Sequence, residues 1–367
     1  MTTETRTRHP YYMYDAIMAQ PHACEKIAAN TRNVAKGAAA KLTGARYIYL
    51  VGIGTSSHAA QVGHLLFREA GVTAPVQALH AFDFALYGPK LAPEDAVIVI
   101  SHRGGKRYSL ESIKRAHEAG CYTVLITGEG EPPTAQYASE TIKTVGQDKS
   151  SAHTVSYCGA IVALACLAEA VSREIKGIEL HPPTFLAQDL PALLAQCLNT
   201  EAQVKALATA HLNHRRIWIV GGGPSGITAQ EIALKIKEAS YLQAEGMPVE
   251  VMMHGPFQCV EPEDLCILIA PSGPAQVRAS EFSTELRAVG VPYLLVDDGS
   301  NARDSALYQG AAAVISVPPV TEALTALTCL LPLQLFSYYL ALARGTNPDG
   351  FRLEDPRFAQ AYKQTQL

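Results

Sequence analysis

The sequence repeats itself once, at a spacing of about 169 residues, and this repeat restricts the possible folds more than any other feature. The glycine-rich segment 51–56 returns at 220–225, and the tripeptide Pro-Glu-Asp at 93–95 returns at 262–264. Such a period is too long for a solenoid and indicates duplication of a whole domain. Each copy alternates short β-branched segments with helical patterns, which favours a parallel, doubly wound sheet. We therefore expect an α/β protein with two tandem domains, each a mainly parallel five-stranded sheet flanked by helices.

Breaks in these patterns divide the chain into five predicted segments. They are an N-terminal helical arm at 1–44, a first α/β domain at 45–175, a helical linker at 176–210, a second α/β domain at 211–343 and a C-terminal tail at 344–367. We expect one helix at 11–33 in the arm, one helical stretch at 190–212 that crosses between the domains, and a proline- and glycine-punctuated tail. Residues 324–343 are as long as a membrane-spanning helix, but their polar positions favour a buried helix packed on a sheet.

Composition excludes several classes of partner. The chain has 367 residues, 48% of them hydrophobic, and a net charge of −4, so bulk electrostatics favour neither nucleic acid nor an anionic membrane surface. Residues 1–9 contain no apolar stretch of a signal peptide, which leads us to expect a cytoplasmic protein. Eight cysteines without a C-x-x-C pair indicate buried reduced thiols. The twelve histidines show no His-x-x-x-His spacing, so we expect no metal and no cofactor.

Two polar loops follow predicted strands of the first domain, at 52–57 and at 101–106. Ligands of open α/β sheets bind beyond the carboxyl ends of the strands, so we expect these loops to be neighbours. Their hydroxyls, backbone N–H groups and helix N-termini suit a phosphate, and Arg103 and Lys106 add positive charge. Taken alone, either loop could equally serve only to turn the chain and cap a helix.

The second domain carries a glycine loop and a charged helix. Glu231, Lys235 and Glu238 fall at i, i+4 and i+7, so they share one helix face, and spacing alone favours a solvated surface ladder. A titratable side chain, His254, follows at a predicted turn. The segment 221–226 fits the dinucleotide pattern G-x-G-x-x-G, but that fingerprint requires an acid at the end of a second strand. The candidate acid, Glu245, is expected to follow a helix, which argues against a dinucleotide site.

The motif E-x-A-L-K-x-K-E-x-S-Y-x-x-A-E at 231–245, followed by H-G-P at 254–256, resembles the sugar isomerase (SIS) family. It is similar in particular to the isomerase half of the glucosamine-6-phosphate synthases, and the resemblance covers nearly the whole chain. It implies two SIS domains that catalyse aldose–ketose isomerisation of a phosphosugar, coupled to removal or addition of an amine. The start at 1–3 lacks the nucleophilic cysteine of a glutaminase half. Any amination would therefore use free ammonia or ammonia from a partner.

The resemblance also assigns roles to individual residues. Glu238 corresponds to the base, and His254 to the ring-opening acid/base supplied by the other subunit of a homodimer. Lys235 is expected to lie next to Glu238 and to hold the developing enolate or enolamine oxygen. Lys363 is available for the role of the family's tail lysine. The implied phosphosugar contacts are Gly54, Thr55, Ser56, Ser101, His102, Arg103, Lys106 and Ser151.

The chain departs from the family pattern in two of its loops. His102, Arg103 and Lys106 replace residues of the family's S-Q-S-G-E-T loop, so the anion site is expected to persist with altered chemistry. In the third loop, at 146–153, the family's sugar-binding glutamate is missing, and Asp148 is available to replace it. His58 and His153 are further candidate site residues.

Two other functions stay open. A deglycase that cleaves a 6-phosphofructosyl-amine would use the same base, and the sequence does not separate it from a deaminase. A non-catalytic phosphosugar sensor belongs to another class, but such modules are usually joined to a DNA-binding helical pair, and no basic pair of this kind occurs here. Retention of Glu238 and His254 favours an enzyme. The sugar, the leaving amine and the direction of reaction remain undetermined by the sequence.

Overall fold

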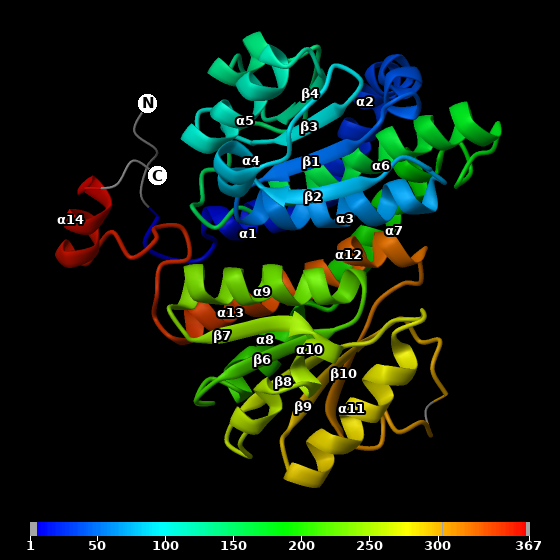
Figure 1. The fold of residues 1–367 in the computed structure, drawn as a ribbon. Helices are drawn as coiled ribbons and strands as arrows, with labels where there is room; N and C mark the ends of the chain where they lie inside the picture. The colour runs from blue at the N-terminus through cyan, green and yellow to red at the C-terminus, as the bar shows by residue number, and fades with distance from the viewer. Residues whose placement is uncertain (1–5, 303, 365–367) are drawn as a thin grey trace. The chain divides into compact units, whose positions relative to one another are not determined.

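The computed structural model describes residues 6–302 and 304–364 and divides into two compact units. The amino-terminal unit comprises residues 19–148 and 153–192, and the carboxy-terminal unit comprises residues 6–18, 149–152 and 193–364. The expectation for residues 1–3 lies outside the described residues, as does part of that for 1–9. Each unit contains a five-stranded parallel sheet covered by helices (Figure 1), which confirms the predicted fold class.

In the amino-terminal unit the strands lie in the order β2-β1-β3-β4-β5 and all pairs are parallel. The strands are β1 Ile48–Gly52, β2 Val76–His80, β3 Ala96–Ile100, β4 Tyr122–Thr127 and β5 Glu140–Lys143. The helices are α2 Gln20–Thr43, α3 Thr55–Glu69, α4 Ala81–Tyr87, α5 Arg107–Glu118 and α6 Val155–Lys176, with short helical turns η1 Pro133–Tyr137 and η2 Phe185–Asp189. Helices α3 and α6 contact each other, as do α4 and α5, and α2 packs on α6. β1 and β3 are buried along their whole length, as a sheet covered on both faces requires.

The carboxy-terminal unit repeats this arrangement, with the strand order β10-β9-β8-β6-β7. The strands are β6 Ile217–Gly221, β7 Ala244–Pro248, β8 Leu265–Ile269, β9 Tyr293–Asp297 and β10 Ala311–Ser316. The helices are α1 Tyr12–Met18, α8 Glu201–Ala210, α9 Pro224–Ser240, α10 Val249–Met253, α11 Gln276–Val289, α12 Thr325–Thr328, α13 Leu330–Ala343 and α14 Pro356–Gln364, with turns η3 Pro256–Cys259 and η4 Glu322–Leu324. Helix α9 packs on β6, β7 and α13.

Several element boundaries differ from the sequence expectation. The arm contains two helices, α1 and α2, and the stretch 190–212 forms two as well, α7 Leu190–Leu198 and α8. The tail, expected to be irregular, ends in helix α14. Glu245 follows helix α9, as expected, but it does not lie in a loop: it is the second residue of strand β7, which pairs with β6 from Ala244 onward. It still lies at the start of that strand rather than at its carboxyl end, where a dinucleotide-binding acid belongs.

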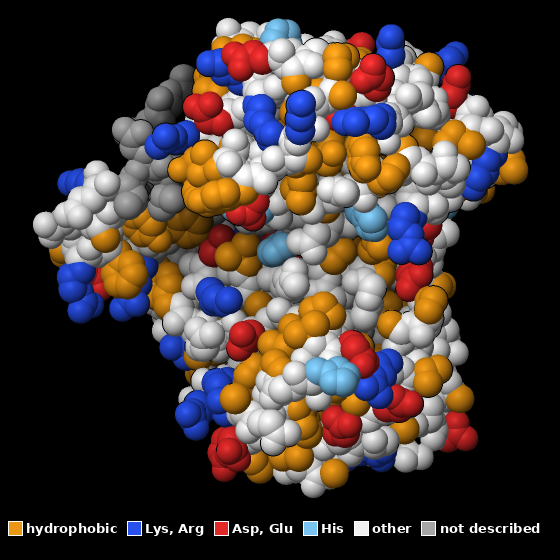
Figure 2. Space-filling view, viewed as in Figure 1, with side chains coloured by type: hydrophobic (Ala, Val, Ile, Leu, Met, Phe, Trp, Pro, Cys, Tyr) orange, Lys and Arg blue, Asp and Glu red, His pale blue; other side chains and the backbone are white. Residues whose placement is uncertain are grey.

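Within residues 6–302 and 304–364, two helices are long and apolar enough to cross a membrane, at Val155–Lys176 and Glu322–Ala343, and 89% of each apolar window is buried inside the protein. The second corresponds to the stretch expected at 324–343, so its prediction as a buried helix is confirmed. All eight cysteines are free thiols, and seven are buried. On the face drawn in Figure 2, acidic and basic side chains are interspersed, and neither sign forms a continuous patch there.

Candidate active site

The glycine loops of the two units have the same backbone shape. Gly54 has φ 55° and ψ −126°, and Gly223 has φ 56° and ψ −128°. A Cβ at Gly52 would lie 2.3 Å from the backbone oxygen of Ser56, so only glycine lets β1 pass this closely to the start of α3. The repeat in the sequence is therefore also a repeat of loop geometry.

The second of these loops, after β6, is nearly filled by the protein itself. The space beside Gly222 and Glu322 measures about 10 Å³, close to the room that one water molecule needs. A Cβ at Gly222 would lie 2.2 Å from the Cβ of Ala275, and one at Gly223 would lie 3.4 Å from Oε1 of Glu322. The loop thus has no room for a pyrophosphate, and the Glu322 carboxylate repels anions. The dinucleotide hypothesis is wrong for this loop.

The first glycine loop, after β1, lies next to the loop that follows β3. β1 and β3 are adjacent, and β2 lies on the other side of β1, so the strand order reverses at β1 and the loops after β1 and β3 share one edge. Thr55 and Ser56 are partly exposed in the first turn of α3. Ser101 is buried after β3, whereas Arg103 and Lys106 are exposed. Hydroxyls, a helix N-terminus and two cations at one edge are the groups that a phosphate requires.

His102, predicted to contact the ligand, is turned inward beneath the second loop. Its ring is mostly enclosed by protein, and its Nε2 accepts a long hydrogen bond of 3.4 Å from the backbone N–H of Asp148. Burial lowers the pKa of His102 to about 4, an effect that the nearby Asp148 charge offsets in part. The ring is therefore neutral at neutral pH.

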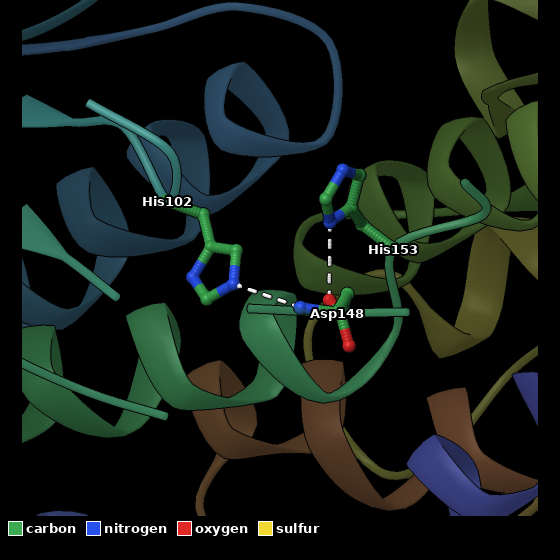
Figure 3. Close-up of side chains that lie close together, drawn as sticks. All are labelled: His102, Asp148 and His153. Atoms are coloured by element: carbon green, nitrogen blue, oxygen red, sulfur yellow. Dashed lines mark hydrogen bonds and ion pairs between the residues drawn. The ribbon is translucent and has the colours of Figure 1, made fainter. Parts of the chain in front are cut away.

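Asp148 is buried and joins the second and third loops. Its Oδ2 accepts a hydrogen bond of 2.6 Å from the hydroxyl of Ser156, and Nδ1 of His153 lies 3.1 Å from the same oxygen. Burial opposes ionisation, but the contacts with His153 and Ser156 outweigh it and lower the pKa of Asp148. Figure 3 shows His102 and His153 around this residue. Asp148 is thus a buried connector rather than the open sugar-binding carboxylate that the sequence allowed.

Ser151, another predicted contact, belongs to the carboxy-terminal unit. Its backbone N–H donates a hydrogen bond of 2.9 Å to the backbone oxygen of Asp349, and the hydroxyl of the preceding Ser150 donates one of 3.3 Å to the oxygen of Pro348. The segment 149–152 is therefore held by the beginning of the tail.

Helix α9 holds three charges in one buried row. Lys235 and Glu231 are fully buried, and the side chain of Glu238 is 17% exposed. Nζ of Lys235 lies 2.5 Å from Oε2 of Glu238 and 3.5 Å from Oε1 of Glu231. Burial alone would lower the pKa of Lys235, but the two carboxylates outweigh burial and raise it, so this lysine stays charged. The surface-ladder interpretation of this helix face is wrong.

Glu238 lines an open pocket of about 460 Å³ at the end of α9. The other walls come from the α9–β7 connection and from the tail: Lys237, Tyr241, Leu242, Gln243, Phe351, Arg352, Phe358 and Tyr362. The hydroxyl of Tyr241 donates a hydrogen bond of 3.0 Å to Glu354, and the guanidinium of Arg352 lies over the ring of Phe358 at 4.3 Å. Tyr241, Phe351 and Arg352 all have positive φ, a strained conformation for side-chain-bearing residues.

Three predicted catalytic residues lie outside the lining of this pocket. Lys235 is completely buried and directed at two carboxylates, so it is placed to orient Glu238 rather than to touch an enolate oxygen. His254 directly follows α10, its side chain is 70% exposed, and its Nε2 lies 2.8 Å from Oε1 of Glu250. Lys363 is exposed on α14, although its neighbour Tyr362 lines the pocket.

Sequence reasoning missed two features of these sites. The cluster of His102, Asp148 and His153 escaped because its members come from loops after β3 and β5 and have no ligand spacing along the chain. The aromatic wall of the pocket escaped because the tail was expected to be irregular. The aromatic residues Phe351, Phe358 and Tyr362 of the tail were the feature of the sequence that could have indicated this wall.

The chain thus consists of two five-stranded α/β units, and Glu238 of the carboxy-terminal unit lines a pocket. The SIS domain profile matches residues 41–170 and 212–344, and the chain belongs to this family.

The chain is similar to several known proteins in sequence and in structure. The chain is 30% identical over 344 residues to a glutamine–fructose-6-phosphate aminotransferase of Pyrococcus horikoshii, covering 93% of this chain and 56% of that protein. The chain thus spans little more than half the length of this curated relative. Among solved structures, the C-terminal domain of glucosamine-fructose-6-phosphate aminotransferase from Francisella tularensis superposes with a TM-score of 0.86 at 20% identity, covering 95% of this chain and 100% of that one. Glucosamine-6-phosphate deaminase from Thermotoga maritima gives a TM-score of 0.74 at 18% identity, covering 92% and 97%.

Proposed function

We propose that this protein is a phosphosugar aldose–ketose isomerase that acts on an amino sugar phosphate and removes or adds the amine. The observation that carries the proposal is the position of Glu238, a residue that lines the pocket and whose carboxylate is in contact with the buried Lys235. A positioned carboxylate is the general base that proton transfer between adjacent carbons requires. The aminotransferase and deaminase relatives support a substrate of the glucosamine 6-phosphate or fructose 6-phosphate type.

In the deamination direction each proton has a defined destination. After ring opening, Glu238 removes the proton from carbon 2 of the amino aldose and gives an enolamine. Protonation at carbon 1 converts the enolamine to the imine of the ketose, and water hydrolyses that imine to ketose phosphate and ammonia. Lys235 touches no substrate atom in this scheme and acts by positioning Glu238. The exposed cations Arg103 and Lys106, with Thr55, Ser56 and Ser101, are proposed to bind the phosphate.

Ring opening needs a second acid/base group. We assign this role to His254, whose side chain is exposed and which does not line the pocket of its own chain. Its exposure is compatible with donation to a second copy, so the proposed active form is a homodimer with a shared site. The free, mostly buried cysteines support a reducing compartment such as the cytoplasm.

A deglycase acting on a 6-phosphofructosyl-amine is the second candidate. The pocket at Glu238 is also lined by aromatic side chains of the tail, Phe351, Phe358 and Tyr362. Such a wall suits a leaving amine larger than ammonia, with an apolar portion that packs on the rings.

A substrate panel tests these alternatives. Hexosamine 6-phosphates and fructosyl-amine 6-phosphates are incubated with the protein, and release of ammonia or amine, ketose phosphate and exchange of the carbon-bound proton with deuterated solvent are measured. Turnover of a hexosamine 6-phosphate supports the deaminase, and turnover of a fructosyl-amine supports the deglycase. Tight binding of one sugar phosphate without turnover or exchange across the panel would contradict both and favour the non-catalytic sensor.

A further inference from the structure

His102, Asp148 and His153 form a cluster that the proposed reaction does not use. One ligand atom from each residue lies within 4.8 Å of the others. Figure 3 shows both imidazole rings next to Asp148, which a dashed contact joins to each of them. Two imidazoles and one carboxylate are a donor set typical of zinc and related transition metals.

We propose that these three side chains bind one divalent transition-metal cation, represented by Zn²⁺, through one ring nitrogen of each histidine and the carboxylate of Asp148. Ligands at about 2.1 Å from a tetrahedral cation lie about 3.4 Å from one another. The separation of 3.1 Å between Nδ1 of His153 and Oδ2 of Asp148 already matches this value. The remaining separations, none above 4.8 Å, have to shorten by at most about 1.4 Å. The side chain of His153 is 21% exposed and has room to turn.

The surroundings of Asp148 suit a metal-binding carboxylate. Its side chain is only 1% exposed, so a cation would neutralise a charge that the fold has taken out of water. Carboxylates that bind metals are usually hydrogen-bonded in turn, and the hydroxyl of Ser156 makes such a bond at 2.6 Å. This contact fixes the orientation of the carboxylate before any cation arrives.

His102 and His153 supply nitrogen lone pairs for the cation and a path by which it can enter from solvent. The Nε2 of His102 already acts as an acceptor, from the backbone N–H of Asp148, and the bond is long and easily replaced. The side chain of His153 is 21% exposed, and it provides the entry path. When Nδ1 of His153 exchanges its hydrogen bond to Asp148 for the cation, the proton leaves Nδ1 and the neutral ring carries its one proton on Nε2. Three protein ligands leave at least one coordination position open for water or an anion.

Direct cation binding tests this site without reference to catalysis. The full-length protein is treated with a chelator, dialysed and titrated with Zn²⁺ by calorimetry, and Co²⁺ uptake is followed by its visible absorption. The expected result is one cation per chain. His153→Gln should weaken binding by about 100-fold or more, because loss of an outer partner alone costs about 10–100-fold. His102→Asn should act in the same way.

A histidine pair elsewhere provides the control. His211 and His214 stack in the carboxy-terminal unit with ring nitrogens 3.0 Å apart. This pair also brings two imidazole rings together, but it does not belong to the proposed site. His211→Gln should therefore leave the Zn²⁺ titration unchanged. If the chelated protein takes up no cation saturably, or if His153→Gln binds as tightly as the unaltered chain, the cluster is a hydrogen-bond network and the proposal is wrong. Because His153 is partly exposed, its variant decides the question even if His102→Asn does not fold.

Discussion

Replacing Glu238 with Gln separates the chemical role of this residue from its structural one. The substitution keeps the size of the side chain and an oxygen that can accept from Lys235, but it removes the base that faces the pocket. A positioned general base contributes about 10²–10⁴ in rate, so turnover should fall by that factor, equivalent to about 3–5 kcal/mol of activation free energy. Exchange of the sugar's carbon-bound proton with deuterated solvent should fall in parallel.

The structure also sets the expected loss of stability. Lys235 is fully buried, and its 2.5 Å contact with Glu238 is a charge-assisted hydrogen bond. Such bonds contribute about 1.5–3 kcal/mol, and Gln retains part of the interaction, so the free energy of unfolding should drop by about 1–2 kcal/mol. In a domain of this size that corresponds to a decrease of a few degrees in Tm.

Glu231→Gln is the matched control on the same helix. Glu231 is fully buried and contacts Lys235 at 3.5 Å, but it does not line the pocket. The Glu231→Gln variant should lose a similar free energy of unfolding. Its turnover and its exchange of the carbon-bound proton with solvent should stay within about tenfold of the unaltered protein, because no base is removed. Both variants are compared by thermal unfolding, steady-state kinetics and deuterium exchange. Equal losses of turnover in the two variants, or unaltered exchange in Glu238→Gln, would refute the assignment of Glu238 as the base.

Three further outcomes follow from the same geometry. Replacing Arg103 and Lys106 together with Ala should raise KM much more than it lowers kcat, because phosphate contacts stabilise substrate and transition state alike; unchanged kinetics would make them ordinary surface charges. Mixing inactive Glu238→Gln and His254→Ala chains should restore activity if sites are shared between subunits, and a mixture no more active than its parents, with subunit exchange verified, would exclude sharing. Gly52→Ala should lower Tm markedly, since the new Cβ would lie 2.3 Å from a backbone oxygen of α3, and an unchanged melting curve would contradict this loop geometry.

Much of the fold was predictable because the repeat and the strand patterns are local signals. Apolar runs such as those of β1 and β6 identify buried parallel strands, and the glycines that follow these two strands mark the turn into the next helix. The adjacency of the loops after β1 and β3 followed from the general topology of open α/β sheets. Element ends were less predictable: β7 begins at Ala244 through pairing with β6, which no local pattern encodes.

The sequence allowed the residue types of the candidate sites to be predicted, but not which of their side chains are buried. Spacing placed Lys235 between two carboxylates on one helix face, yet it favoured solvent exposure, because helical periodicity does not reveal that α13 also packs on α9. His102 was assigned to a ligand from its place in the second loop, and the ring instead turns toward Asp148, a contact 46 residues away in sequence. Long-range contacts of this kind are set by the assembled sheet and leave no trace in residue spacing.

The closure of the second glycine loop determines how many anions one chain can hold. Duplication produced two loops with nearly identical backbone angles, and a chain with two working copies would bind two phosphates. The carboxylate of Glu322 lies beside Gly223 of the second loop and would repel a phosphate there. The expected stoichiometry is therefore one sugar phosphate per chain. Two side chains from further along the sequence, Ala275 against Gly222 and Glu322 against Gly223, thus make the two copies of the duplicated loop unequal.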